Sequence, residues 1–193
     1  MASGKGGRVS RREAAMADPE PACVQFGNHR IDARPHFMQV IGDGKVIRPE
    51  HFEAFIQFAA DVFESGEEFT SIRRRVRLFP MLTDRWRNRT LEDIEDRLSP
   101  MLRLVYREGH RLSFESQHAI ETERGRALVV RFVPGVWDLC DAAEAAKGKL
   151  FAWPDAPKIP LKGCRKRDCG CSWTGTSRAE RDAFLAQQGK RES

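Results

Sequence analysis

EHFEAFIQFAADVFE, residues 50–64, is the stretch that most clearly determines the fold of this 193-residue chain. Its apolar side chains recur at spacings of three and four, the pattern of a helix that buries one face. Pro49 suits the first turn of such a helix, and Gly66 suits its C-terminal end. We therefore predict a helix here, with its phenylalanine side chains packed against a core.

The residues before this helix have the composition of a hairpin. VQF at 24–26 and FMQVI at 37–41 are rich in β-branched and aromatic residues, which strands favour. Gly42 and Gly44 flank Asp43 and allow the positive φ angles of a tight turn. The sequence predicts strands between residues 24 and 46 that turn at these glycines.

The residues after it predict a second helix and two more strands. Thr90 is a suitable N-cap for the helix, Pro100 should kink or split it, and Gly109 should end it. RLSFES at 111–116 and RALVVRFV at 126–133 then have the texture of strands. The second of these is mostly apolar, so it is the better candidate for a central strand.

The remaining residues complete an α+β fold. We expect a short helix within residues 136–151, then a proline-rich stretch, the cysteine segment and a short terminal helix. No regular β-α-β alternation is present, so we expect a small antiparallel sheet with three or four helices. The chain divides into a disordered N-terminal arm (residues 1–21), an α+β domain (22–153) and a Pro/Cys-rich C-terminal segment (154–193).

Three cysteines lie within eight residues of the C-terminal segment: Cys164, Cys169 and Cys171, in the spacing C-x4-C-x-C. Thiolates are soft ligands that suit zinc, and a structural zinc site takes four ligands in a tetrahedron. Cys140, on the short helix before them, is the expected fourth ligand. The alternatives for that place are His110 and His118. Such a site would hold together a segment that has little core of its own.

The same cysteines are open to other interpretations. Their spacing misses the C-x4-C-x2-C of plant-type iron–sulfur proteins by one residue. Cys169 and Cys171 could instead form a strained disulfide with a redox role, or the three could be free thiols without a function. Cys23 stands apart from the group and is expected to be a small buried or free thiol.

A wider pattern includes these cysteines and covers about 40 residues. It consists of Cys140, Gly148, Lys149, Phe151, Pro157, Pro160, Leu161, Cys164, Cys169, Cys171 and Trp173. The pattern resembles the C-terminal segment of a group of small uncharacterised bacterial proteins. This chain departs from the group where Trp173 replaces a tyrosine and where a His/Asp/Arg-rich ending would follow. The resemblance implies only that the four cysteines act together.

A run of arginines follows the predicted helix at 50–64. Seven arginines lie between residues 73 and 89, interleaved with Phe79 and Trp86. Arginine binds phosphate and stacks on bases, so the run is typical of a nucleic-acid interface. An acidic protein partner, or ion pairs with the acidic residues on either side, are the alternatives. The expected interface residues are Arg73, Arg74, Arg75, Arg77, Arg85, Trp86, Arg87 and Arg89.

Few other residues suggest catalysis. His29, Asp32 and His36 lie close in sequence and could bind a metal or transfer protons, but on a strand the two histidines would lie on opposite faces. Glu115 and His118 form only half of the motif that di-iron proteins use. The sequence has no glycine-rich phosphate loop or nucleophile elbow, so nothing suggests a nucleotide-cofactor enzyme.

The composition narrows the class of protein. The chain carries a formal net charge of +5, and 32% of its residues are charged. It has no secretory signal and no apolar run near the roughly 18 residues of a membrane-spanning helix, so we expect a cytoplasmic protein without a membrane partner.

The expected function combines the two motifs. We expect a non-enzymatic binding protein with a structural zinc site and an arginine-rich face for nucleic acid or an acidic protein. The alternatives are a thiol- or metal-dependent enzyme built around Cys169 and Cys171, and a subunit of a larger assembly. The oligomeric state does not follow from the sequence.

Overall fold

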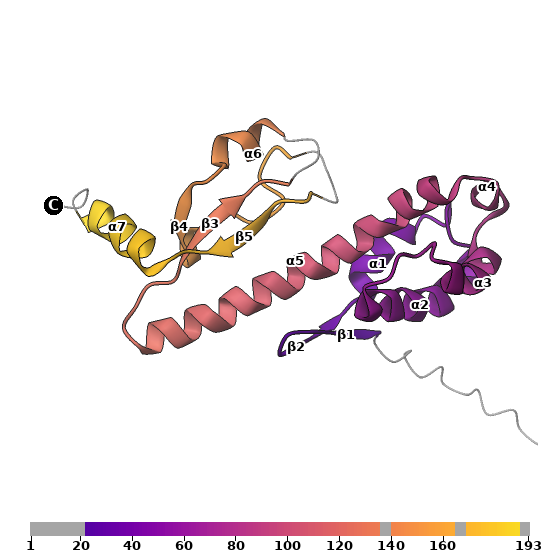
Figure 1. Cartoon of the computed structure of the whole chain (residues 1–193), viewed down its shortest axis with the longest axis horizontal. Coiled ribbons are helices and arrows are strands. Elements are labelled where there is room, and N and C mark those ends of the chain that lie inside the picture. Colours follow the sequence, from indigo (N-terminus) through magenta and orange to yellow (C-terminus); the bar gives the residue numbers. More distant parts are fainter. Residues whose placement is uncertain (1–21, 136–139, 165–168, 190–193) are drawn as a thin grey trace, which may run out of the picture.

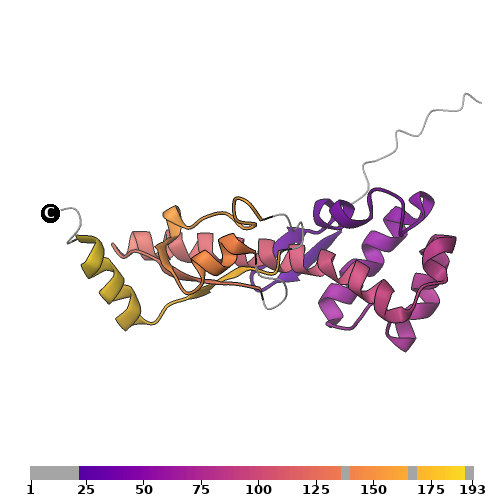
Figure 2. The ribbon, with the colours of Figure 1, turned by 90° about the horizontal axis from the view of Figure 1, so that it is seen from above.

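The computed structural model describes residues 22–135, 140–164 and 169–189. They form two lobes joined by one long helix, α5 (Leu91–Glu123), which runs through the molecule in both views (Figures 1 and 2). We call residues 22–110 the N-terminal lobe and residues 129–189 the C-terminal lobe. The expected N-terminal arm lies outside the described residues.

The predicted α+β class is confirmed. The described residues form two small antiparallel sheets, one of two strands and one of three, where the sequence predicted a single sheet. They also form seven α-helices, more than the three or four expected. None of the described helices is long and apolar enough to cross a membrane.

The predicted helix at 50–64 is the central helix of the N-terminal lobe, α2 (Phe52–Ser65). A short 3-10 turn, Pro49–His51, leads into it, and Gly66 ends it with a φ of +66°. On its buried face, Phe55 and Phe58 lie about 6 Å from the ring of Phe69, at ring-centroid distances of 6.0 Å in both cases. The burial of these aromatic rings forms the core of the lobe, as the spacing predicted.

The predicted hairpin is displaced along the chain. It consists of β1 (Cys23–Phe26) and β2 (His29–Asp32), and Gly27 between them has a φ of +56°. The predicted strand at 37–41 is wrong, because these residues belong to helix α1 (Arg34–Ile41). A proline in the first turn favours helix, and the buried residues of α1 recur at spacings of three and four against the core.

Helix α5 is longer than the sequence predicted. Thr90 caps it as expected, since its hydroxyl accepts a 3.1 Å hydrogen bond from the Asp93 backbone N–H. Pro100 does not split the helix and Gly109 does not end it, and the predicted strand at 111–116 is wrong because these residues are helical. Burial of the apolar stripe along α5 offsets the cost of an internal proline.

Two short helices complete the N-terminal lobe, beside α2 and the N-terminal end of α5 (Figure 1). They are α3 (Ile72–Met81) and α4 (Asp84–Arg87). Pro80 lies in the last turn of α3, and Met81 ends the helix. An isolated bridge between Ile47 and Leu82 ties the α3–α4 link to the core.

The C-terminal lobe is built on β3 (Val129–Val133), the central strand that the sequence predicted. Its neighbours are β4 (Leu150–Ala152) and β5 (Ser172–Gly175), both antiparallel to it. Thus a strand from the predicted C-terminal segment completes the sheet.

Three helical segments accompany this sheet. The expected helix within 136–151 is α6 (Asp141–Ala146), whose Ala143 and Ala146 pack into the core of the lobe. The expected terminal helix is α7 (Arg178–Gly189), and Ser177 caps it by accepting a hydrogen bond from Glu180 N–H. A 3-10 turn, Trp153–Asp155, follows β4, and Trp153 meets Phe114 of α5 at a ring-centroid distance of 5.2 Å.

Candidate metal centre and arginine-rich face

The four cysteines proposed as metal ligands lie in one part of the C-terminal lobe. Cys169 and Cys171 are buried, and both belong to the hydrophobic cluster around Phe132. Cys140 and Cys164 are half-buried and pack against the same cluster. The fold therefore brings together residues 31 positions apart in sequence, as the zinc hypothesis requires of its ligands.

Cys169 is in contact with both of its neighbours in the segment. Its thiol interacts with the side chains of Cys171 and Cys164, and it accepts a hydrogen bond from the Cys171 backbone. Burial, together with the neighbouring Cys171 thiol, raises the pKa of Cys169 above its ordinary value, although the backbone donor and Cys164 act in the opposite direction. Without a cation, Cys169 is thus a neutral thiol at neutral pH, and a bound cation would favour its thiolate.

Two glycines allow the cysteine segment to approach the end of β3. A Cβ atom on Gly135 would lie 2.9 Å from the backbone carbon of Gly170, which is closer than real Cβ atoms come. The loop after β3 and the backbone between Cys169 and Cys171 are therefore in direct contact. Only a residue without a side chain fits at position 135.

The described side chains do not form a preassembled metal site. In the part of the chain that the structure describes, no three His, Cys, Asp or Glu side chains form a group that could hold a metal as it stands. Of the alternative ligands, His110 packs edge-on against Phe26 of the N-terminal lobe at 5.1 Å. His118 is on α5, and its buried Nδ1 atom has no hydrogen-bond partner among the described residues. Cys140 packs against the same cluster as Cys169 and Cys171, which makes it the better candidate for the fourth ligand. All five cysteines are free thiols, Cys23 being half-buried in β1.

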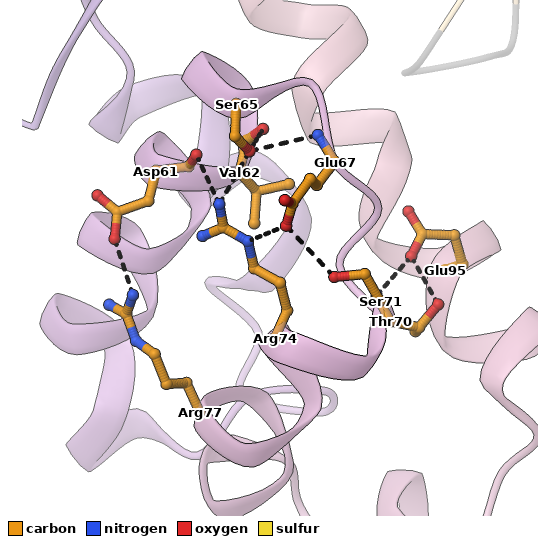
Figure 3. A network of polar contacts seen from close by, with 9 residues as sticks. All are labelled: Asp61, Val62, Ser65, Glu67, Thr70, Ser71, Arg74, Arg77 and Glu95. Atoms are coloured by element: carbon orange, nitrogen blue, oxygen red, sulfur yellow. Dashed lines mark hydrogen bonds and ion pairs between the residues drawn. The ribbon is translucent and has the colours of Figure 1, made fainter.

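The run of arginines between 73 and 89 divides into structural and exposed members. Arg74 is structural (Figure 3): its guanidinium donates to Glu67 at 3.0 Å, to Ser65 at 2.9 Å and to the Asp61 carbonyl at 3.3 Å. Only 14% of its side chain is exposed. Arg74 therefore ties α3 to the C-terminal end of α2.

Arg77 and Arg75 also bond within the lobe. Arg77 pairs with Asp61 at 2.9 Å (Figure 3). Its guanidinium also lies 5.2 Å from the centre of the Phe58 ring. Arg75 donates a 2.6 Å hydrogen bond to the carbonyl of Thr70. In the same region Glu95 of α5 accepts hydrogen bonds from the Thr70 backbone and hydroxyl. These contacts fix the start of α3 against α2 and α5.

Two residues of α4 face inward. Arg87 donates to the carbonyls of Phe79 and Pro80 at 2.9 Å, which links α4 to the end of α3. Trp86 is partly buried and packs against the core of the N-terminal lobe. The Arg87 guanidinium and the Trp86 ring thus already make contacts within the lobe, which leaves less of each to bind a phosphate or stack on a base.

The exposed members are Arg73, Arg77, Arg85 and Arg89, and of these Arg77 pairs with Asp61. The side chains of Arg73, Arg85 and Arg89 form no hydrogen bond or ion pair with a described residue, in contrast to those of Arg74, Arg77 and Arg87. The helix that carries Arg73 also carries two exposed aliphatic side chains. Ile72 and Val76, one helical turn apart, are each 80% exposed, the highest values among the large apolar residues described. The exposed face of α3 around Ile72, Arg73 and Val76 thus has fewer available arginines than the sequence suggested, and it is partly apolar.

Among the described residues, the other candidates do not form a metal-binding group. His29 is on β2 and His36 is on α1, while the Asp32 carboxylate accepts a 3.0 Å hydrogen bond from the Arg34 backbone at the start of α1. Glu115 forms an ion pair with Arg111, its neighbour one turn earlier on α5.

A cleft between the lobes was not predicted from the sequence. Its walls come from α1, α5, the turn after β4, and β5, and they include His36, Arg107, Glu108, Trp153 and Trp173. These residues are up to 137 positions apart, so no local motif could have grouped them. The only signal was in single residues, such as His36 within HRIDARPH.

Comparison with protein-family models, with curated proteins and with solved structures finds no match to this chain. The function is therefore inferred from the geometry described above.

Proposed function

We propose that this protein is a non-enzymatic binding protein that engages an acidic protein partner through α3, with a C-terminal lobe held together by zinc. One observation carries the binding role, the exposure of Ile72 and Val76 on the same helix as Arg73, whose side chain has no described partner. Removing large aliphatic side chains from water is favourable. On a helix that is anchored to its own lobe, this happens only when a partner covers them. A reducing compartment such as the cytoplasm would keep the five thiols available.

The chemistry of this face favours a protein over nucleic acid. A nucleic-acid surface uses free arginines and stacking aromatics, whereas Arg74, Arg77 and Arg87 are engaged within the lobe. Two adjacent aliphatic side chains suit the apolar side of an amphipathic helix, and Arg73 suits acidic residues that border it. The partner we propose therefore presents an acidic amphipathic helix.

The zinc site is proposed from the same four cysteines. Cys164, Cys169 and Cys171 have neighbouring side chains, and Cys140 borders the same cluster. The Cys171 backbone N–H that donates to the Cys169 sulfur would also stabilise the Cys169 thiolate. Zinc binding favours the thiolate as well, and would offset the rise in the pKa of Cys169 that burial causes. Zinc would stabilise a lobe whose hydrophobic cluster is much smaller than that of the N-terminal lobe.

A thiol-dependent enzyme is the less well supported alternative. A nucleophilic cysteine needs a depressed pKa and access to substrate. Cys169 and Cys171 are both buried, and burial raises the pKa of Cys169. These features suit a metal ligand or a core thiol better than a nucleophile.

The zinc proposal is tested by elemental analysis of protein purified without chelator. We expect about one zinc per chain in the parent protein and in Cys23→Ser, because Cys23 is in the other lobe. Cys171→Ser and Cys140→Ser should each lower the zinc content or its retention during dialysis. A zinc content near zero in the parent protein would contradict the site. Fast alkylation of Cys171 at neutral pH would favour the enzyme instead.

The partner proposal is tested with a defined probe, a glutamate-rich amphipathic helical peptide with leucines one turn apart. Its affinity should fall in Val76→Ser and in Arg73→Gln, and it should weaken with salt. A labelled duplex DNA and a single-stranded RNA are measured in parallel. Tight nucleic-acid binding at low salt that Arg73→Gln weakens and Val76→Ser does not would overturn the proposal in favour of a nucleic-acid interface.

A further inference from the structure

The cleft between the lobes has the size of a small-molecule site. Its volume is about 570 Å³, within the roughly 300–1,000 Å³ that ligand pockets occupy. One wall is α5 with α1 beside it, and the other is the stretch from Trp153 to Ile159 together with β5. The cleft is thus made by both lobes. None of the four cysteines and none of the arginines between residues 73 and 89 lines it, although Trp173 and Ile159 also pack against the cysteine cluster.

Arg107 gives the cleft its clearest chemical preference. The side chain lines the cleft, and its Nη1 atom is buried without a hydrogen-bond partner among the described residues. A buried guanidinium N–H without an acceptor is costly, and an anionic oxygen is the acceptor that suits it best. Arg107 therefore carries an unsatisfied, charge-assisted donor on a side chain that lines the cleft.

The other charges of the cleft leave it cationic. Arg111 is already balanced by two carboxylates, with Glu108 at 2.6 Å and Glu115 on the other side. Lys158 adds an exposed ammonium group on the opposite wall. The cations Arg107, Arg111 and Lys158 thus outnumber the two anions by one, before any protonation of the histidines.

The remaining walls are apolar and aromatic. Trp153 and Trp173 line the cleft together with Leu104, Pro157 and Ile159. Each indole packs against another aromatic ring. The ring centroids of Trp153 and Phe114 are 5.2 Å apart, and those of Trp173 and Phe132 are 5.3 Å apart. Anchored aromatic rings of this kind favour a flat, apolar ligand body.

We propose that this cleft binds a small organic anion, a carboxylate or phosphate group attached to a flat apolar body. Arg107 donates to the anionic oxygens, Lys158 adds charge from the opposite wall, and Trp153 and Trp173 contact the apolar body. Because the ligand touches both lobes, its binding holds them in the arrangement seen here.

Isothermal titration calorimetry with four defined probes tests this site on the full chain. They are 1-naphthyl phosphate, 1-naphthoate, uncharged 1-naphthol and inorganic phosphate. We expect one of the two naphthyl anions to bind, and the preference between them identifies the anionic group. Naphthol and inorganic phosphate should bind at least about tenfold more weakly, since each lacks one of the two recognition elements.

Arg107→Gln should lower the affinity for the preferred anion by about 10- to 100-fold. Arg85→Gln is the matched control, because it removes the same charge from an exposed position in the N-terminal lobe. Lys158→Gln tests the opposite wall at an exposed side chain that the fold does not need, and it should also weaken binding. If neither naphthyl anion binds, if naphthol binds equally well, or if Lys158→Gln and Arg107→Gln both bind like Arg85→Gln, the proposal is wrong.

Discussion

Gly109 lies directly beneath the ring of Phe26. A Cβ atom at position 109 would come within 2.4 Å of Phe26 Cγ, so only glycine lets the β1–β2 hairpin pack onto α5. The ring is also held by Tyr106 and His110, at centroid distances of 5.9 and 5.1 Å. This glycine is in the middle of a helix because of a tertiary contact.

Gly109→Ala should therefore destabilise the N-terminal lobe, although alanine is the better helix former. Overpacking costs about 1–3 kcal/mol, which is more than the helix propensity of roughly 1 kcal/mol returns. Denaturant unfolding should show a net loss in the free energy of unfolding. In a Phe26→Leu background the penalty should shrink, and an equal penalty in both backgrounds would contradict this contact as its cause.

Substitution of Arg74 should change the free energy of unfolding much more than substitution of its neighbour Arg73. Arg74→Met removes donors to Glu67, Ser65 and Asp61, and it should lower the free energy of unfolding by about 1–3 kcal/mol. Arg73→Met leaves no described carboxylate unpaired, so its stability should stay within about 0.5 kcal/mol of the parent. Equal stability of the two variants in urea would refute a structural role for Arg74.

Gly135 and Gly170 should respond differently to the same substitution. Gly135→Ala drives a Cβ to 2.9 Å from backbone that cannot move aside, whereas Gly170→Ala places its Cβ at an ordinary 3.5 Å. We expect Gly135→Ala to lower the melting temperature and, if zinc binds there, to weaken zinc retention. Gly170→Ala is the matched control, and similar losses in both variants would count against the close approach.

The stability of the protein should fall below about pH 6.5, in part through His36. Burial lowers the pKa of this histidine, with Arg107 acting in the same direction and Glu108 and Asp32 opposing it. The unfolded chain then binds the proton more readily than the folded chain, so stability is complete above the ordinary pKa and is lost as the pH falls through the folded one.

The difference between parent and His36→Gln isolates this contribution. Between about pH 8 and pH 5.5 the parent should lose more stability in denaturant than the variant. The pKa values of Glu53 and Glu108 are also lowered, by their arginine partners first, but carboxylates of this kind contribute below about pH 4.5. A variant that loses as much stability as the parent over this range would exclude His36.

The sequence predicted the elements whose signal is local. The spacing of the phenylalanines in α2, the Thr90 cap and the apolar run of β3 are each contained in a few consecutive residues. Such patterns depend on side-chain period and on short-range hydrogen bonds, which tertiary structure did not alter at these positions.

The wrong predictions concern residues whose local preference is overruled by packing. FMQVI at 37–41 has strand composition, yet Phe37, Val40 and Ile41 reach the core only when the segment is helical. Gly109 has the character of a helix end, but Phe26 occupies the space that a side chain would fill. Neither partner can be recognised from the neighbouring sequence.

By itself, the sequence of this protein determined the α+β class, the central helix and the grouping of cysteines in the C-terminal segment. Only the tertiary structure decided which arginines are structural and which are exposed, and only it assembled the cleft around Arg107. The physical reason is distance along the chain: periodicity and capping act within a few residues, whereas ion pairs, burial and cavities join residues that meet only after the chain has folded.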